Sequence, residues 1–387
     1  MFGKEKPNSR IKRRTLDKQN ESVYIRKGRG AKSMKANTSG QTIYDIAGEA
    51  GVSIATVSRV VRGDAAVSPE TRRRVEAVIA SRNYRPNALA QSMAGGKTHS
   101  LGIVLPKLLN PHYAMLFTGA FDGARRQGYS MSLFPWASLV ENDAENPALM
   151  LAERRLDGVI ICVEYLPAEL LAHLRKSLRE LEAYMPIVLI GCVPEELDYP
   201  SISYNMAEIT RSVVDELVTL GHERIALIGG KEEDRDELRR DVGYREGLAA
   251  ARLPCVDSYR VFCGGSARDG EEAVRSMLSA LLPAHWPTAY IALNDMVAMG
   301  CMEALRQRGF RIPQDASVVG CDNLFCAPYL TPPLTSIDTH QQALGRDAVN
   351  LLLSGEKKKE RVRWEWARRA SCGPAPGKRS SSESGAG

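Results

Sequence analysis

From Ser100 onward, short apolar runs alternate with longer amphipathic stretches. The runs are rich in Val, Ile and Leu, whereas the stretches between them repeat apolar residues at helical spacing. The runs read SLGIVLP, YSMSLF, DGVIICV, PIVLIG, RIALIGG, AYIALN and SVVGC. Because strands that are apolar along their whole length are covered on both faces, the alternation predicts buried strands in doubly wound parallel sheets. The number of runs favours two sheets over one barrel.

Residues 42–86 show a different pattern, with three short amphipathic stretches. TIYDIAGEAG predicts a first helix that ends at its last glycine. Ser53 is expected to cap a second helix, in which Val57, Val60 and Val61 form an apolar stripe. A third helix begins at a Ser-Pro pair. Two short helices joined by a tight turn within a small all-α bundle are typical of the helix-turn-helix motif.

The outward face of the second predicted helix carries side chains that could read DNA. In a helix-turn-helix, the second helix enters the major groove. Arg59 can give guanine two hydrogen bonds, and Thr56 and Ser58 can reach phosphates. Small apolar side chains at the start of the helix can meet a thymine methyl. The outward candidates are Ile54, Ala55, Thr56, Ser58, Arg59 and Arg62. The alternative is a plain three-helix bundle with a solvated arginine.

The charge distribution favours a polyanionic partner for the N-terminal quarter. The formal net charge is +6, yet residues 1–41 hold 12 Lys and Arg against 3 Asp and Glu. Residues 42–97 hold 8 against 5, and residues 98–355 reverse the sign with 23 against 34. A basic head on an acidic body indicates nucleic acid at the head, although a phospholipid surface would satisfy the charge alone.

Several other classes of protein lack support in the sequence. No secretory signal follows the charged start, and no apolar run approaches the ~18 residues of a membrane span, so we expect a cytoplasmic protein. The eight cysteines form no CxxC pair, which argues against a disulfide framework or a zinc site. No phosphate loop, HExxH or GxSxG motif occurs, so we expect no catalytic residue, metal or cofactor.

The same residues belong to a longer resemblance that runs from Thr42 to Ser371. It begins with TIYDIAGEAGVSIATVSRVVRG and VSPETRRRVEAVIASRNYRPNALAQSMAGG. In order there follow SLGIVLP, NPHYAMLFTGAFDGARRQGYS, DGVII, LGHERIALIGG, GYREGL, ALNDMVAMGCMEALRQRGFRIPQDASVVGCDN, LTPPLTSID and LGRDAVNLLL. This chain resembles the lactose/galactose repressor (LacI/GalR) family of bacterial transcription regulators. The resemblance implies a homodimeric repressor whose affinity for a near-palindromic DNA operator is controlled by a small effector, expected to be a sugar or sugar derivative.

The resemblance and the composition together predict a domain layout. It comprises a disordered basic leader (1–41), a helix-turn-helix domain (42–86), a hinge helix or linker (87–97), an effector-binding and dimerisation domain (98–371) and a disordered tail (372–387). The effector domain is expected to hold two periplasmic-binding-protein-like subdomains. These cover about 98–200 with 338–356, and about 203–335 with 360–371. The leader either adds phosphate attraction or is a solvated segment.

The segment PNALAQSMAGG matches the family's hinge, a helix that forms when two subunits' copies meet in the DNA minor groove. The resemblance implies minor-groove contacts from Asn87, Ala90, Gln91 and Met93. Met93 stands where the family usually has a leucine wedge, and its flexible apolar side chain is suited to intercalation. A simple linker is the alternative.

The resemblance also implies an effector site at the carboxyl ends of the strands, where open α/β sheets bind ligands. In the family, an arginine and Asn or Asp side chains bind ligand hydroxyls and an aromatic ring covers a sugar face. The matching positions are Asn110, Tyr113, Arg240, Asn294 and Asp322, with Trp136 as the other candidate ring. Arg240 could instead lie in a solvated run and Asp322 in a turn. Tyr204 stands where the family often has Asp, a change expected to alter the cleft.

Two alternatives to a repressor are a periplasmic-type solute-binding protein and a nucleotide-dependent enzyme. The basic helical head argues against the first and the missing phosphate loop against the second. The sequence leaves open whether the effector is an inducer or a corepressor.

Overall fold

The structure is a computed structural model, and it describes residues 42–61, 64–84, 97–106, 109–135, 151–164, 166 and 170–377. The chain divides into two compact units, Met1–Asn87 and Ala88–Gly387. Several predictions fall outside the described residues, and these concern the leader 1–41, Arg62, the hinge residues 87–96, Trp136 and the tail from 378 onward.

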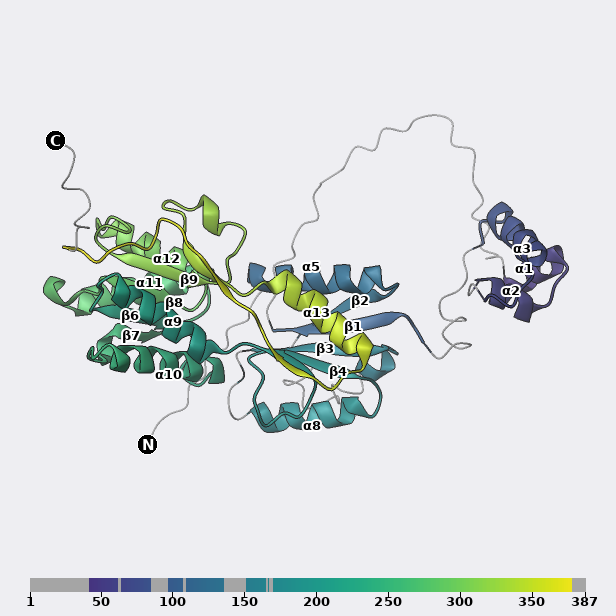
Figure 1. The fold of residues 1–387 in the computed structure, drawn as a ribbon, viewed down its shortest axis with the longest axis horizontal. Helices are drawn as coiled ribbons and strands as arrows, with labels where there is room; N and C mark the ends of the chain where they lie inside the picture. The colour runs from purple at the N-terminus through teal and green to yellow at the C-terminus, as the bar shows by residue number, and fades with distance from the viewer. Residues whose placement is uncertain are drawn as a thin grey trace, which may run out of the picture. The chain divides into compact units, whose positions relative to one another are not determined.

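The described part of the first unit contains three helices (Figure 1). They are α1 (Ile43–Ala50), α2 (Ile54–Val61) and α3 (Pro69–Ser81). Gly51 ends α1 at φ 62, a left-handed conformation that glycine adopts without strain. The Ser53 hydroxyl accepts a hydrogen bond from the Thr56 amide at 3.2 Å and so caps α2, as predicted. The buried side chains that join the helices are Ile46, Ala47, Ala50, Val57, Val60 and Val75.

The second unit holds two six-stranded sheets, each covered by helices. The first sheet has the strand order β11-β5-β4-β3-β1-β2, and its paired strands all run parallel. Its strands are β1 (Ser100–Leu105), β2 (Ser130–Pro135), β3 (Gly158–Val163), β4 (Ile187–Gly191), β5 (Ser201–Ser203) and β11 (Lys359–Arg361). With α5 (Pro111–Arg126), α8 (Leu171–Glu182) and α13 (Gln341–Ser354), this sheet forms the first lobe.

Alternate residues of the central strands point to opposite faces of the first sheet. Ile103 packs in one apolar cluster with Leu116 of α5 and Val349 of α13. Its neighbour Val104 packs in another cluster with Leu174 of α8. The helices α5 and α13 therefore cover one face and α8 the other (Figure 1). The predicted strand YSMSLF is β2, but it is half-exposed rather than buried because it lies at the edge of the sheet.

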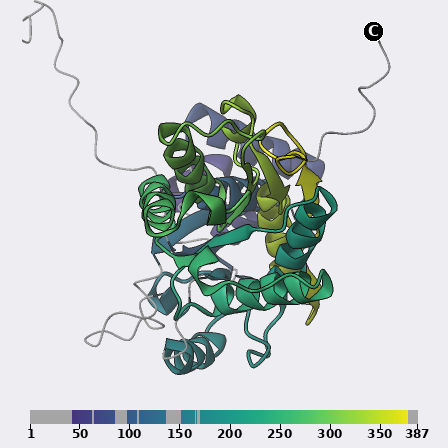
Figure 2. The same ribbon diagram turned by 90° about the vertical axis from the view of Figure 1, so that its left-hand side faces the viewer.

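The second sheet has the order β12-β10-β9-β8-β6-β7, with β12 antiparallel to β10. Its strands are β6 (Ile225–Gly229), β7 (Arg260–Phe262), β8 (Ala289–Ala292), β9 (Ser317–Cys321), β10 (Thr335–Asp338) and β12 (Glu365–Ala367). Its helices are α9 (Met206–Thr219), α10 (Arg235–Ala250), α11 (Ala267–Ala280) and α12 (Asp295–Gln307), with 3-10 turns at Asp257–Tyr259, Pro283–His285 and Ala327–Tyr329. The pairs α9–α10 and α11–α12 cover opposite faces (Figure 2), and these elements form the second lobe.

The chain passes between the two lobes three times, after β5, after β10 and between β11 and β12. The prediction of two doubly wound parallel sheets is confirmed. The strands β5, β7, β11 and β12 have three residues each, too few for a periodic signal, so the sequence does not predict them. The four-residue strand β10 is also not predicted, because its sequence TSID holds a single apolar residue. Packing continues past Ser371 into the segment expected to be a disordered tail, since the Ala375 amide donates to the Leu220 carbonyl at 2.9 Å.

Among the described residues, no helix combines the length and the apolar character needed to cross a lipid bilayer.

Candidate functional site

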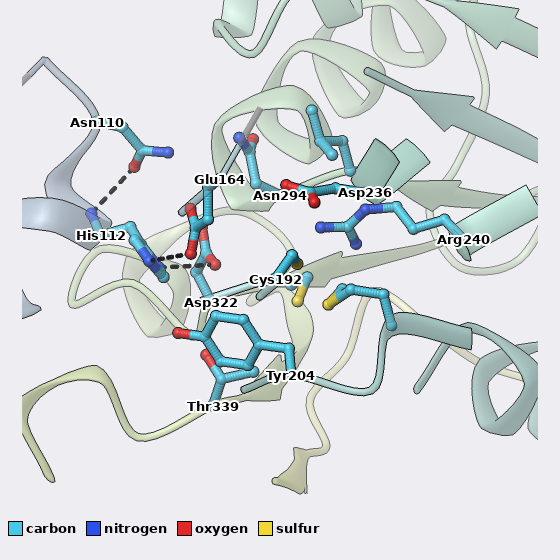
Figure 3. Close-up of a pocket in the computed structure, with 13 residues that line it drawn as sticks. Asn110, His112, Glu164, Cys192, Tyr204, Asp236, Arg240, Asn294, Asp322 and Thr339 are labelled. Atoms are coloured by element: carbon cyan, nitrogen blue, oxygen red, sulfur yellow. Dashed lines mark hydrogen bonds and ion pairs between the residues drawn. The ribbon is translucent and has the colours of Figure 1, made fainter. Parts of the chain in front are cut away.

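A polar chamber lies between the two lobes at the carboxyl ends of their strands (Figure 3). Parallel strands end at the same edge of a sheet, so side chains that follow different strands meet there. The space in the chamber is about 30 Å³. The chamber is lined by Asn110, His112, Glu164, Cys192, Tyr204, Met206, Asp236, Arg240, Leu293, Asn294, Cys321, Asp322 and Thr339.

His112 lies between two carboxylates in this chamber (Figure 3). Its Nδ1 is 3.0 Å from Asp322 Oδ1 and its Nε2 is 3.6 Å from Glu164 Oε1. Burial by itself would lower the pKa of His112, but the charges of Asp322 and Glu164 overcome it and raise the pKa to about 10. The His112 charge holds the pKa of Glu164 below its usual value despite burial. Because Asp322 belongs to the second lobe, the imidazolium links both lobes.

The position of His112 follows from the start of α5. The Asn110 side chain accepts a hydrogen bond from the His112 amide at 3.0 Å and caps the helix, with Pro111 at its first position. The cap places His112 in the first turn, where its side chain is only 4% exposed. A local sequence signal, Asn-Pro-His, therefore fixes where the helix begins and which side chain enters the chamber.

Asp322 reaches the chamber from a strained turn after β9. Its φ is 115°, and that of Asn323 is 51°, both in the region that favours glycine. The Asp322 carbonyl accepts a hydrogen bond from the Gln341 side chain at 2.7 Å, and the Asn323 side chain accepts one from Arg369 at 2.6 Å. Such conformations persist where surrounding contacts fix them, often at ligand sites. The turn thus holds the Asp322 carboxylate against His112.

Arg240 and Asn294 come from the second lobe. Asn294 caps α12, accepting a hydrogen bond from the Val297 amide at 2.8 Å, while its amide nitrogen donates to the Gly265 carbonyl at 3.3 Å. The Arg240 side chain is 13% exposed and its Nε is 3.9 Å from Glu237 Oε2. It reaches into the chamber, so the alternative that it lies in a solvated run is wrong (Figure 3).

A second cavity of about 460 Å³, here called the mouth cavity, shares Asn110 and Leu293 with the chamber. Tyr113 lines it but is 1% exposed, and its hydroxyl donates a hydrogen bond to Glu164 at 2.7 Å. The mouth cavity is lined by Leu109, Asn110, Tyr113, Gly230, Lys231, Asp234, Cys263, Gly264, Gly265, Ser266, Asp269, Leu293 and Met296.

Most of the sequence-predicted effector residues meet at this cleft. Asn110, Arg240, Asn294 and Asp322 line the chamber, Tyr113 lines the mouth cavity, and Trp136 lies outside the described residues. Sequence reasoning missed the charged residues His112, Glu164 and Asp236. A usable signal existed for Glu164, which directly follows the apolar run DGVIICV. His112 and Asp236 lie in the first turns of helices and gave no such signal.

The outward face of α2 is exposed at Ile54, Ala55 and Arg59, and half-buried at Thr56 and Ser58. Thr56 Oγ1 lies 2.9 Å from Ser53 Oγ, at hydrogen-bonding distance. This face together with the two-lobed cleft defines a class of protein, the DNA-binding regulators that carry a ligand-binding domain.

Comparisons with known proteins identify the family. Residues 42–87 match the model for bacterial regulatory proteins of the lacI family, and residues 214–372 match a periplasmic binding protein-like domain. Catabolite control protein A of Priestia megaterium is 32% identical over 314 residues, which is 80% of this chain and 91% of that protein. The chain belongs to the LacI family of bacterial regulatory proteins.

Further relatives agree with this assignment. The HTH-type transcriptional repressor PurR of Vibrio parahaemolyticus is 31% identical over 319 residues, 82% of this chain and 93% of that protein. The lac repressor dimer bound to operator and the anti-inducer ONPF superposes with a TM-score of 0.76 at 28% identity, covering 86% of this chain and 99% of that one. The protein is therefore a DNA-binding transcription regulator with an effector-binding domain, and not an enzyme. Dimeric assembly and allosteric control by a ligand are typical of the family.

Proposed function

We propose that this protein is a homodimeric repressor whose operator affinity is set by a small polyhydroxylated effector bound between the lobes. The observation that carries the proposal is the convergence of polar side chains from both lobes on one chamber. Carboxylates accept hydrogen bonds from hydroxyl groups, whereas Arg240 and the amide of Asn294 can donate to them. A concave site with a few convergent polar groups is the form that small-ligand sites take.

The effector would act by changing how the lobes close on each other. A ligand that contacts both lobes favours one closure angle, and it can shift the equilibrium only by its differential affinity for the two states. In the proposed mechanism, closure changes the separation of the two subunits' hinge segments, residues 87–97, and so the contacts of Met93 in the minor groove. An inducer would weaken operator binding and a corepressor would strengthen it.

DNA reading is assigned to residues 42–86, with base contacts from Ile54, Ala55 and Arg59 of α2. The half-buried Thr56 and Ser58 are suited to the phosphates that flank the groove. A protein that binds an operator must lie in the same compartment as the chromosome, so we place this protein in the cytoplasm. The solved complex of the regulator CelR with cellobiose, 27% identical to this chain with a TM-score of 0.62, supports a carbohydrate effector.

A gel shift tests the proposal. Operators would first be selected from random palindromic duplexes with the purified full-length protein. We expect saturable binding to one palindrome at a concentration at least 100-fold below that for scrambled DNA, in line with the specificity of such regulators. Binding that is equal on selected and scrambled duplexes would contradict the proposal.

A further inference from the structure

The charge balance in the chamber limits which effector it can hold. Three carboxylates, those of Glu164, Asp236 and Asp322, line a space that also contains the cationic groups of Arg240 and His112. All five belong to side chains that are mostly buried. An anionic ligand would enter a space in which carboxylates outnumber cations, and burial strengthens the repulsion between like charges.

Several of the backbone groups that usually bind anions are already occupied around the cleft. Phosphates bind at helix N-termini because the first amides are free and the dipole is positive there. Here Asn110 accepts from the first turn of α5, Asn294 from that of α12 and Ser266 from that of α11. The Gly230 amide donates to Glu237 at 2.8 Å. The first turn of α10 has no side-chain cap, but it carries Asp236, whose carboxylate lines the chamber and would repel a phosphate group.

Tyr204 provides a third and independent observation. It follows β5, its backbone amide donates to the Gly191 carbonyl at 2.9 Å, and its side chain is 5% exposed. Its hydroxyl is buried and has no hydrogen-bond partner among the described residues. Figure 3 shows the ring inside the chamber, with the hydroxyl on the side where His112 and Asp322 lie. A buried hydroxyl without a partner costs free energy unless a ligand supplies one.

We propose that the chamber and the adjoining mouth cavity together take an uncharged, hydroxyl-rich effector, exclude its phosphate esters, and use the Tyr204 hydroxyl to hydrogen-bond a hydroxyl of that effector. The inference rests on the proposed function, since it concerns the same cleft. Burial, followed by the nearby carboxylate of Glu164, raises the pKa of Tyr204 far above neutrality, so the group stays an uncharged donor and acceptor. Sugar hydroxyls can donate to the carboxylates, whereas the oxygens of a phosphate dianion can only accept hydrogen bonds.

The test uses the full-length protein and pairs of probes. Glucose, galactose, ribose and cellobiose are titrated beside glucose 6-phosphate, galactose 6-phosphate and ribose 5-phosphate, with thermal shift and calorimetry as readouts. We expect at least one uncharged sugar to bind, and any phosphate ester in the set to bind at least tenfold more weakly than its parent sugar. An ester that binds as tightly as its parent sugar would overturn the charge selectivity. If none of the sugars binds, the proposal that the effector is an uncharged, hydroxyl-rich molecule is wrong.

Tyr204→Phe tests the hydroxyl, and Tyr290→Phe is its matched control. Tyr290 lies on β8 in the core of the second lobe, and its buried hydroxyl also lacks a partner among the described residues. Both variants remove an unpaired hydroxyl, so both should keep the wild-type melting temperature. Sugar binding should weaken about tenfold in Tyr204→Phe and stay unchanged in Tyr290→Phe. Equal sugar affinities in all three proteins would overturn the role of Tyr204.

The experiments distinguish a failure of this inference from a failure of the proposed function. Each protein is also assayed for operator binding in the gel shift. Selective operator binding without any sugar binding would refute the inference and leave the DNA-binding function standing. Loss of selective operator binding in the wild type would refute the proposed function itself.

Discussion

The His112 imidazolium is held by a carboxylate from each lobe, Glu164 from the first and Asp322 from the second. A buried ion of this kind adds modest stability when paired, but removing one partner leaves the others buried and uncompensated. The residue therefore links the closure of the lobes to the charge state of one side chain.

Replacing His112 should remove a pH-dependent part of the stability. The pKa of His112 is about 10 in the folded protein against an ordinary value of 6.5, so its stabilisation is complete below pH 6.5 and disappears as the pH rises through 10. At pH 6.5, His112→Gln should lower the free energy of unfolding by about 3 kcal/mol. Urea unfolding at several pH values should show this difference shrinking toward pH 10. A difference that stays constant across that interval would contradict the assignment.

Arg59 is the exposed residue of α2 best suited to read a guanine. Arg59→Ala should weaken the free energy of binding to the selected operator by about 1–3 kcal/mol and relax the base preference at one position. Arg74→Ala on α3, which is also exposed, is the control and should weaken binding evenly on all sequences if it contacts phosphate. Gel shifts on operators with single base changes measure both effects. A uniform loss for Arg59→Ala would assign that residue to the DNA backbone.

Among the elements, the pair α5 and α13 determines the geometry of the first lobe. Two glycines let the helix backbones approach closely, since a Cβ on Gly119 would lie 2.0 Å from the Gln342 carbonyl oxygen and one on Gly345 would lie 2.2 Å from that of Leu116. These helices begin at the cleft, α5 after Asn110 and α13 shortly after the chamber residue Thr339. Their packing thus positions one wall of the effector site.

Two substitutions on α5 distinguish the effect of close helix packing on stability from the effect of helix propensity. Gly119→Ala should lower the free energy of unfolding by about 2–3 kcal/mol, because backbone atoms of α13 must move. Gly123→Ala meets its nearest atom at 3.2 Å, and the gain in helix propensity of about 1 kcal/mol should offset most of its strain. Denaturant unfolding measures both variants. Equal stabilities of the two variants would mean that the helices can separate at no cost.

How well the sequence predicts a strand depends on the length of its apolar run. Apolar runs of four or more residues, such as SLGIVLP, indicated the longer strands because their burial on both faces leaves a continuous signal. The short strand Ser201–Ser203 gave no such signal, yet it places Tyr204 in the chamber. Its neighbours in the sheet, β4 and β11, are what make it a strand.

On the scale of the whole molecule, the three chain passages between the lobes restrict their relative movement to bending of a few connecting residues. The Arg361 side chain donates a hydrogen bond to the Ser203 hydroxyl at 3.1 Å, which joins the ends of β11 and β5, the two strands that lead into two of these passages. A ligand that bridges the cleft would therefore act on one bending motion.

The separation of charge along the whole chain predicts the behaviour of a truncated protein. Residues 1–41 hold 12 Lys and Arg against 3 Asp and Glu. If these residues contact DNA phosphates, their deletion should weaken binding to selected and to scrambled DNA by the same factor. The slope of the logarithm of the binding constant against the logarithm of the salt concentration should become less steep by ~0.9 for each lost contact. Gel shifts between 50 and 200 mM salt measure the slope. An unchanged slope would identify the leader as a solvated segment without a role in binding.

The sequence by itself determined the helix-turn-helix, the two doubly wound sheets and the family, because these depend on periodicity within short stretches and on motifs in a fixed order. It also indicated Asn110, Arg240, Asn294 and Asp322, which follow strands or match motifs. Only the tertiary structure decided that His112 pairs with both Glu164 and Asp322, and that the Tyr204 hydroxyl is buried without a partner. The hydrogen-bond or ion-pair partner of a buried polar group depends on which strand ends lie next to each other in the folded protein. A pattern within a short stretch of sequence does not contain that information.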